Sequence, residues 1–448
     1  MLAVCLLPPS SHSLSAQPSP HPSATPLLAE TVKVMEEVRP HAHVDLDCFF
    51  AAAEELRHPE FVGQPLAVGG GPNRGVIATA NYAARRFGVG SAMPVRLALQ
   101  KCPDLVIVPP DFSWYKTLSL EVFATVADFV ESFSPMSLDE ARCTLLPSQD
   151  WSTLPDLAER LRESVRHRTG LAISFGAGPT PIIAKLAVGR AKPDGAFIVD
   201  PSAAEDFLTT TALADIPGLG PSTLARLTSS GIYSVVQLSN TPVLALESLI
   251  GRAHAASILS AVSPLPQALP SLSSPASHSI GSETTLPEDV RDFEQFRSLV
   301  KEVATTTTAR LHHRGLGARG LTLKARSSSF ADITRSRAFP APTNDGYDIT
   351  RVALSLAPEV FDTLGSSIRL VGVTVTGLTD LVQPSLPLGQ SRLAPLLPPP
   401  FPDTGQRVQH RVFGNGVVML GSPDTAIVKF DTGSKIIEDP RTHLVIIS

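Results

Sequence analysis

Hydrophobic residues recur with two different periods along residues 43–177. Short apolar runs predict buried strands, whereas apolar positions spaced three or four residues apart predict helices. The predicted strands cover residues 43–49, 65–68, 76–80, 105–108 and 172–177. The predicted helices cover residues 51–56, 81–87, 94–100, 114–133 and 154–168. This mixture predicts an α+β domain with several short strands.

The pattern changes after about residue 200, where short helices alternate with glycine turns. Residues 264–277 are rich in proline and serine, which predicts a linker. Over residues 279–378 the predicted order is βαββαβ, which suits a small sheet with helices on one face. Residues 381–404 are again proline-rich and predict a tether. Residues 405–448 predict a small β module with turns at 414–416 and 431–433.

Composition allows a multidomain protein and excludes several classes. A chain of 448 residues is long enough for about two to four domains. It has no apolar run long enough to cross a membrane. Its four cysteines form no C-x-x-C pair, so we expect neither a zinc site nor disulfides, and a cytoplasmic location. The net charge of −5 does not indicate nucleic-acid binding, although a binding face needs only local positive charge.

The first forty residues differ in composition from the rest of the chain. Residues 1–40 are rich in proline and serine, and we expect a disordered extension. A secretory signal is disfavoured, because no Lys or Arg precedes the first apolar run and Pro8 and Pro9 interrupt it. Met35 is a candidate for the true start of the protein.

Acidic residues mark the ends of two apolar segments. Asp45 and Asp47 alternate on the first predicted strand, with Leu46 pointing to the other face. Asp139 and Glu140 lie together within the apolar segment 134–145. Carboxylates beside an apolar sheet are costly unless something positive neutralises them, and Mg²⁺ does this well. Taken singly, each acid is better explained as a surface charge or a helix cap.

The acids lie within a series of motifs. In chain order the segments are 45–52 (DLDCFFAA), 80–89 (ANYAARRFGV), 91–94 (SAMP), 137–141 (SLDEA) and 191–195 (AKPDG). This series, across residues 43–379, resembles the Y-family of translesion DNA polymerases, specifically its bacterial DNA polymerase IV (DinB type) branch. The first and fourth segments look like the catalytic motifs of that family, the second like its finger motif and the last like its triphosphate motif.

The resemblance implies a right-hand polymerase fold. It implies a palm at 41–50 and 112–199, fingers at 51–111, a thumb at 200–263 and a βαββαβ little-finger domain at 278–380. The module at 405–448 resembles small SH3- or Tudor-like barrels. The implied activity is template-directed, error-prone translesion synthesis, in which a dNMP is added to a primer 3′-OH during DNA damage tolerance.

The resemblance also implies roles for individual residues. Asp45, Asp139 and Glu140 would bind two Mg²⁺ ions, for which Mn²⁺ can substitute, and the Leu46 carbonyl would complete one metal shell. Asp47 would be a neighbour of the site rather than a ligand. Phe50 would be the steric gate that excludes a ribose 2′-OH. The nucleotide-binding set would be Phe49, Phe50, Thr79, Tyr82, Arg85 and Lys192.

Further segments predict contacts with DNA and with a protein partner. Gly218 and Gly220 lie in IPGLGPST, which resembles a helix-hairpin-helix turn that grips phosphates through backbone N–H groups. Strand alternation predicts one basic face on the little finger, with the DNA-binding set Arg319, Lys324, Arg326, Arg335 and Arg337. The tether segment QPSLPL looks like a peptide that binds the β subunit of the bacterial sliding clamp, through Gln383, Leu386 and Leu388. The expected partners are therefore primer–template DNA, a dNTP and the clamp, for a monomer in the nucleoid-containing cytoplasm.

Two departures from the family pattern leave an alternative open. Arg142, Cys143 and Thr144 follow Glu140-Ala141, where the family usually has an aromatic residue and then an acid. Gly189 and Arg190 precede Ala191, where an acid is common. The alternative is a non-catalytic relative that acts as a scaffold in a clamp-bound mutagenesis complex. Such a relative would be expected to lose the catalytic acids, and all three are present.

Overall fold

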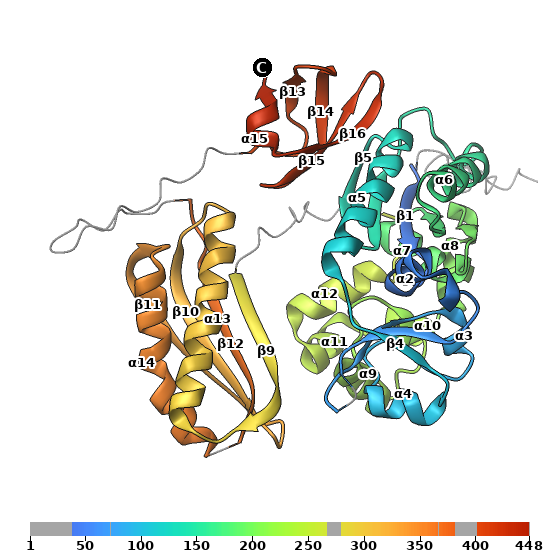
Figure 1. Ribbon diagram of the computed structural model, residues 1–448. Coiled ribbons are helices and arrows are strands. Elements are labelled where there is room, and N and C mark those ends of the chain that lie inside the picture. Colours follow the sequence, from blue (N-terminus) through green and yellow to red (C-terminus); the bar gives the residue numbers. More distant parts are fainter. Residues whose placement is uncertain (1–37, 72, 267–278, 366, 381–400, 448) are drawn as a thin grey trace, which may run out of the picture.

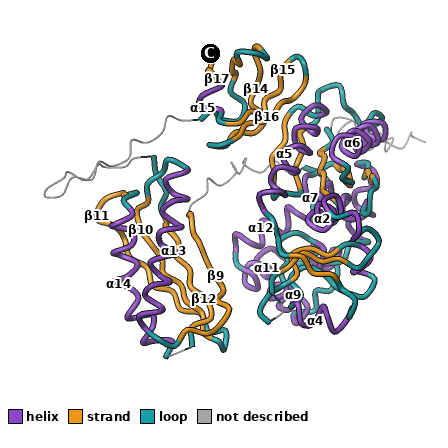
Figure 2. Tube along the Cα trace, in the orientation of Figure 1, coloured by secondary structure: helices purple, strands orange, loops and turns teal. Residues whose placement is uncertain are grey.

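The computed structural model describes residues 38–71, 73–266, 279–365, 367–380 and 401–447. Helices pack against several separate sheets, so the predicted α+β class is confirmed (Figures 1 and 2). Most of the expected extension, most of the linker and the whole clamp-binding peptide lie outside the described residues.

The palm is built on a five-stranded sheet with the order β5-β6-β1-β7-β8. The strands are β1 (His41–Leu46), β5 (Ser132–Pro135), β6 (Glu140–Thr144), β7 (Ile173–Gly178) and β8 (Ala196–Ile198). The helices are α2 (Phe49–Arg57), α5 (Phe112–Phe129), α6 (Leu154–Thr169) and α7 (Pro181–Ala191). Strand β1 lies in the middle and pairs antiparallel with both β6 and β7, which places its residues at the centre of the palm.

The two faces of β1 carry different kinds of residue. Ala42, Val44 and Leu46 are buried in one core with residues of α5 and α6. His43 and Asp45 alternate with them and therefore point to the opposite face. Helix α7 packs on β7 and β1, and it crosses β7 very closely at Gly176. A Cβ atom at Gly176 would lie 2.2 Å from the backbone nitrogen of Val188, so only glycine allows this crossing.

The fingers lie between β1 and β5 in the chain, whereas the thumb follows β8. The fingers hold a three-stranded sheet, β3-β2-β4, with β2 (Leu66–Gly69), β3 (Ile77–Ala80) and β4 (Val106–Val108). Two helices accompany it, α3 (Tyr82–Arg85) and α4 (Val95–Lys101). The thumb is helical, with α8 (Ala204–Thr209), α9 (Pro221–Ser229), α10 (Val235–Ser239), α11 (Val243–Ile250) and α12 (Arg252–Ala261). Ile183, Leu186 and Ala187 of α7 belong to the thumb core, so α7 joins palm and thumb.

The little finger has the predicted βαββαβ order. Its elements are β9 (Ser279–Val290), α13 (Phe293–His313), β10 (Ala318–Ser327), β11 (Asp332–Thr343), α14 (Gly346–Leu364) and β12 (Ile368–Thr376). The sheet order is β11-β10-β12-β9, with every neighbouring pair antiparallel. Helices α13 and α14 lie side by side on one face of this sheet (Figure 1).

The C-terminal module is a five-stranded antiparallel sheet with the order β16-β15-β14-β13-β17. Its elements are β13 (Arg407–His410), β14 (Gly414–Gly421), β15 (Thr425–Phe430), β16 (Gly433–Glu438), α15 (Pro440–His443) and β17 (Leu444–Ile446). The predicted turn at 431–433 is confirmed, and Gly433 has a φ of +101° there. The predicted turn at 414–416 is wrong, because β14 already begins at Gly414.

One predicted helix boundary is also wrong. The helix predicted over 114–133 ends at Phe129, and β5 begins at Ser132. Apolar residues continue through both elements, so hydrophobic pattern alone does not locate the break. Among the described residues no single helix is long and apolar enough to cross a membrane. One pair, Val243–Ile250 with Arg252–Ala261, meets that test only jointly and is bent by 120°.

Candidate active site

Strand pairing brings together three acids that are far apart in the chain. Asp45 on β1 lies directly opposite Glu140 on β6. The backbone N–H of Leu46 donates to the carbonyl of Asp139 at 2.7 Å, which places Asp139 at the same end of the sheet. Burial raises the pKa of Asp45, and the nearby carboxylates of Asp139 and Glu140 add to this rise although Lys192 opposes it. The backbones of the three acids therefore lie at one end of the palm sheet.

The turn before β6 is fixed by Ser137. Its hydroxyl accepts hydrogen bonds from the backbone N–H groups of Asp139 and Glu140, at 3.2 and 3.1 Å. The same hydroxyl donates to the Asp139 carboxylate. A side chain that bonds its own local backbone stabilises such a turn. Ser137 thus sets where both acids enter the site, a role that sequence reasoning did not assign.

Each acid is turned toward a different partner. Lys192, just after α7, forms an ion pair with Asp45. Lys185 of α7 donates to both oxygens of Glu140, at 2.8 and 2.7 Å. The Asp139 carboxylate accepts from Ser137. Among the described residues no three His, Cys, Asp or Glu side chains converge as a metal-binding group.

His43 is a second residue that sequence reasoning missed. Its side chain is 1% exposed, and its Nε2 lies 3.2 Å from Oε2 of Glu140. This hydrogen bond, together with Lys185, lowers the pKa of Glu140 to about 2 despite partial burial. The other ring nitrogen, Nδ1, is buried without a hydrogen-bond partner in the described part of the chain. Two sequence signals were available: His43 alternates with Asp45 on one strand, and Lys185 precedes Lys192 by two helical turns.

The donor set fits a hard divalent cation. Carboxylate oxygens and a backbone carbonyl are the ligands that Mg²⁺ prefers. Asp45 and Glu140 are only 14% and 19% exposed, and ammonium groups already neutralise them. The donor types therefore suit a divalent cation, whereas in this structure the ammonium groups of Lys192 and Lys185 pair with Asp45 and Glu140.

Asp47 is the centre of a hydrogen-bond network beside the acids. It is buried, and its carboxylate accepts from the Ser174 hydroxyl, from the Tyr82 hydroxyl at 3.1 Å and from the backbone N–H of Asp194 at 2.6 Å. These bonds join the palm strand to the fingers and to the segment after Lys192. The expected role of Asp47, a neighbour of the site rather than a ligand, agrees with this arrangement.

Two predicted nucleotide-binding residues lie together where fingers meet palm. The guanidinium of Arg85 lies over the ring of Tyr82, 4.9 Å from its centroid, and its Nε donates to the Ala80 carbonyl at 2.9 Å. Burial and the adjacent Asp47 raise the pKa of Tyr82. Thr79 precedes them on β3 and is partly exposed.

The predicted steric gate is held in place by aromatic residues. The Phe50 ring stacks on Tyr115 with centroids 4.6 Å apart and planes at 15°, and the edge of Phe112 approaches it at 5.8 Å. The Tyr115 hydroxyl donates to the Glu54 carboxylate at 2.6 Å, which fixes the ring on which Phe50 stacks. The side chain of Phe49, by contrast, is 1% exposed in the palm core. The nucleotide contact predicted for Phe49 stays a prediction, and its backbone rather than its buried side chain would have to make it.

The two departures from the family pattern have different surroundings. Arg142 alternates with Glu140 on β6, lies opposite His43 and is exposed. Arg190 is turned to the thumb, where it donates to the Thr210 carbonyl at 3.2 Å and lies over the Phe207 ring. The arginine at 190 therefore joins palm to thumb, whereas Arg142 adds a positive charge to the face that carries the acids.

The glycine turn of the thumb has the conformation that its sequence predicts. Gly218 has a φ of +96°, a region that favours glycine, and Gly220 precedes the first residue of α9. Ile216 and Leu219 are buried while both glycines are exposed. The backbone at Gly218 and Gly220 is thus open at the start of α9.

The basic residues of the little finger do not share one face. Lys324 and Arg326 lie on the face that the helices leave open. Arg335 and Arg337 lie directly opposite Leu323 and Leu321 on β10, so they share the helix-covered face with these buried leucines. Arg335 pairs with Glu359, and Arg337 donates to Ser355 at 2.7 Å, both on α14. The prediction of a single basic face is wrong, because the register between the two strands is not readable from alternation alone. Arg319 is exposed near the start of β10.

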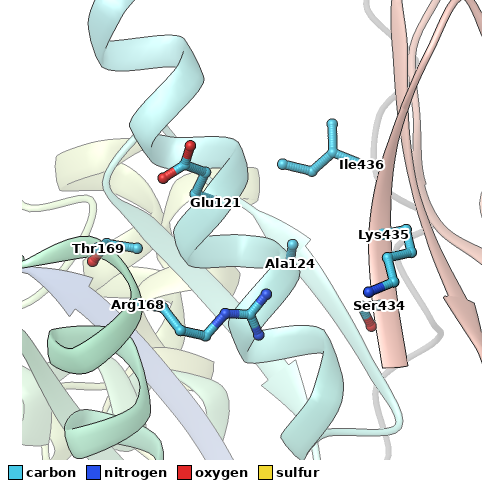
Figure 3. Close-up of a pocket in the computed structure, with 7 residues that line it drawn as sticks. All are labelled: Glu121, Ala124, Arg168, Thr169, Ser434, Lys435 and Ile436. Atoms are coloured by element: carbon cyan, nitrogen blue, oxygen red, sulfur yellow. The ribbon is translucent and has the colours of Figure 1, made fainter. Parts of the chain in front are cut away.

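The C-terminal module contacts the back of the palm, away from the acids. Figure 3 shows the hollow between α5 and β16. It is lined by Glu121, Ala124, Arg168, Thr169, Ser434, Lys435 and Ile436. None of the predicted catalytic residues lines it, so this hollow is separate from the candidate active site.

Comparison with known proteins agrees with this architecture. Residues 44–189 match the model of the impB/mucB/samB family, and residues 277–388 match that of its C-terminal domain. DNA polymerase IV of Halorhodospira halophila is 34% identical over 338 residues, covering 75% of this chain and 94% of the relative. DNA polymerase IV of Streptomyces coelicolor is 32% identical over 423 residues, covering 90% of this chain and 88% of the relative.

Solved structures with the same fold are more distant in sequence. A Y-family DNA polymerase chimera of Dbh and Dpo4 superimposes with a TM-score of 0.70 at 23% identity, covering 77% of this chain and 100% of that chain. Dbh DNA polymerase in an insertion ternary complex gives a TM-score of 0.53 at 24% identity. With a fold shared by Y-family polymerases and relatives matched over nearly their whole length, the chain belongs to the DNA polymerase IV family.

Proposed function

We propose that Asp45, Asp139 and Glu140 are the catalytic carboxylates of this protein, which is a DNA-directed DNA polymerase of the translesion type. Membership of the DNA polymerase IV family carries the activity. The assignment of residues rests on one observation. Asp45 and Glu140 lie directly opposite each other on β1 and β6, and the backbone N–H of Leu46, the next residue of β1, donates to the Asp139 carbonyl.

Members of this family work with divalent metal ions, and we assign Mg²⁺ to the three carboxylates and the Leu46 carbonyl, with Mn²⁺ as a substitute. We further assign two ions, in keeping with the chemistry of phosphoryl displacement. When bound, such ions lower the pKa of the attacking primer 3′-OH and neutralise charge on the leaving pyrophosphate. The protein needs no nucleophile of its own, so catalysis is mostly positioning and charge neutralisation.

The cationic side chains have a role on the nucleotide. Lys192 is bonded to Asp45. We assign it to the triphosphate of the incoming dNTP, an anion that can replace Asp45 as its partner. Arg85 carries a planar fork that suits phosphate oxygens, and its stacking on Tyr82 already fixes its position. Lys185 and His43 hold Glu140 and act as positioning residues.

The assignment of Phe50 as a steric gate rests on the aromatic residues that hold its ring in place. Tyr115 and Phe112 contact the ring from two sides, so it cannot turn aside easily. A rigid ring beside the sugar would exclude a 2′-OH and thereby favour dNTPs over rNTPs.

The other assignments concern DNA and partners. Primer–template DNA would be held by the backbone at Gly218 and Gly220 and by Lys324 and Arg326. Gln383, Leu386 and Leu388 would bind the β subunit of the sliding clamp, from a tether that the structure does not describe. We expect a monomer that works in the cytoplasm, at the nucleoid.

Primer extension tests the proposal. Wild-type protein should extend a primed template with Mg²⁺ or Mn²⁺, and Asp139→Ala should reduce extension at least a thousandfold. Glu163→Ala is the matched control, because Glu163 is an exposed acid on α6 outside the site. Absence of extension by the folded wild type would favour the scaffold alternative. Full activity of Asp139→Ala would refute the residue assignment.

A further inference from the structure

The face of the little-finger sheet that α13 and α14 leave open carries equal numbers of cations and anions in its central rows. Leu321, Leu323, Ala325, Val371 and Val373 belong to the core beneath the helices, so their neighbours on each strand point away from it. The pairing places twelve of these residues in three rows across this face. The rows are Ser336, Thr322, Thr374 and Gly281; Thr334, Lys324, Gly372 and Glu283; Asp332, Arg326, Leu370 and Thr285. Most of these residues are hydroxyl-bearing or small, and the charged ones are two cations and two anions.

Each cation is bound by an acid of the same face. The Lys324 ammonium lies 2.8 Å from Oε2 of Glu283. The Arg326 guanidinium makes two parallel bonds to Asp332, at 2.5 and 2.8 Å. A paired fork of this kind is among the better-formed ionic contacts. The two positive charges of these rows are therefore neutralised in the DNA-free protein.

The contact between Lys324 and Glu283 depends on the residue between them. Gly372 lies between the two on β12, and the Glu283 side chain lies over it. A Cβ atom at Gly372 would come within 3.3 Å of both Cγ and Oε2 of Glu283. The missing side chain thus gives the carboxylate room to reach across the strand.

These ion pairs do little for the stability of the fold. All four side chains are between 29% and 45% exposed, and exposed pairs contribute little because water and salt screen them. The main electrostatic effect of these ion pairs is on the binding of an anion, such as a phosphate, to this face. A phosphate must compete with a carboxylate for each cation, and it is repelled by that carboxylate once the exchange has occurred.

We propose that Glu283 and Asp332 limit the affinity of the little finger for DNA by competing with phosphates for Lys324 and Arg326. This inference rests on the proposed placement of DNA on the open face. Exchange of a carboxylate for a phosphate releases fewer net counterions than binding to a free cation, so it also weakens the salt dependence of binding. The carboxylates therefore keep the DNA contact weak and quickly reversible.

The double substitution Glu283→Gln with Asp332→Asn removes both negative charges and keeps the size of each side chain. We expect full-length protein with these changes to bind a fluorescent primer–template duplex about three- to tenfold more tightly at low salt, measured by anisotropy. The slope of log affinity against log salt should steepen by about one for each freed cation. Lys324→Ala with Arg326→Ala should have the opposite effect on affinity.

Glu359→Gln is the matched control. It breaks the Arg335–Glu359 pair, which has the same chemistry but lies on the helix-covered face, so affinity should not change. Thermal unfolding of every variant confirms that it is folded, and primer extension reports separately on the polymerase assignment.

Three results would overturn the inference. If the charge-removing variant binds no more tightly while Lys324→Ala with Arg326→Ala weakens binding, the carboxylates do not limit affinity although DNA uses this face. If neither double variant changes binding while primer extension is normal, DNA does not lie on this face. If Glu359→Gln strengthens binding equally, the effect is one of net charge and not of these pairs.

Discussion

The C-terminal module should stabilise the palm through Ile427. Residues of β15 alternate between two cores: Val428 and Phe430 belong to the core of the module, whereas Ile427 is fully buried in the palm core with residues of α5. Met419 of β14 joins the same palm core. Replacing Ile427 by alanine removes buried methyl and methylene groups and leaves a cavity, which costs about 2–5 kcal/mol at a rigid site.

Tryptophan fluorescence can measure this loss in the palm alone. The chain has two tryptophans, and both, Trp114 and Trp151, pack against the palm core. Urea unfolding followed by their emission should show a clearly lower midpoint for Ile427→Ala. Ile446→Ala is the matched control, because Ile446 lies on β17 of the same module and is 50% exposed. That variant should unfold like the wild type.

The reasoning would be refuted if Ile427→Ala and Ile446→Ala gave the same midpoint as the wild type. Such a result would mean that the module is a separate unit whose loss the palm does not sense. Lys429→Met gives an independent reading of the same interface. The Lys429 ammonium donates to the carbonyls of Ala127 and Val130 at the end of α5, at 2.8 and 3.1 Å. Its removal should cost about 1.5–3 kcal/mol, as for hydrogen bonds to charged groups.

Three further predictions concern the active site. The pKa of Glu140 is lowered from 4.5 to about 2, so its bonds to His43 and Lys185 stabilise the fold above pH 4.5, and this stability is lost as the pH falls toward 2. In His43→Gln the urea midpoint should therefore drop less between pH 6 and pH 3 than it does in the wild type. An unchanged drop would contradict the assignment of His43 to Glu140. Phe50→Ala should raise the kcat/KM for rNTPs at least tenfold relative to dNTPs in single-nucleotide insertion, while Phe87→Ala, an exposed phenylalanine of the fingers, should not. Lys192→Met should raise the KM for dNTP about tenfold or more, and an effect confined to kcat would speak against a triphosphate contact.

The sequence could predict the acids but not how they are held. Asp45 and Glu140 could be predicted because each lies in a motif that borders an apolar segment. Hydrophobic periodicity cannot show that the two acids lie near each other, whereas the family resemblance implies it. His43 could not be assigned in the same way, because its contact with Glu140 depends on the register of β1 against β6. A single histidine among apolar residues is more often a core residue than a partner in a site.

The little finger shows the same limit more sharply. Its βαββαβ order could be predicted, because each element carries its own period of hydrophobic residues. The division of its basic residues could not, since a shift of one residue between β10 and β11 would move Arg335 and Arg337 to the other face. The register is set by packing of Leu321 and Leu323 under α13 and α14, which depends on residues distant in the chain.

A common feature joins the active site and the little finger. Three of the cations assigned to phosphates, Lys192, Lys324 and Arg326, are each paired with a carboxylate of the protein, namely Asp45, Glu283 and Asp332. Binding of a nucleotide or of DNA is then an exchange of anionic partners for a cation already in position. Such an exchange recovers only the difference between two ionic contacts, so we expect a chain with a net charge of −5 to bind a polyanion without holding it tightly. Under the proposed clamp contact, weak direct binding to DNA would let the enzyme leave once the lesion has been copied.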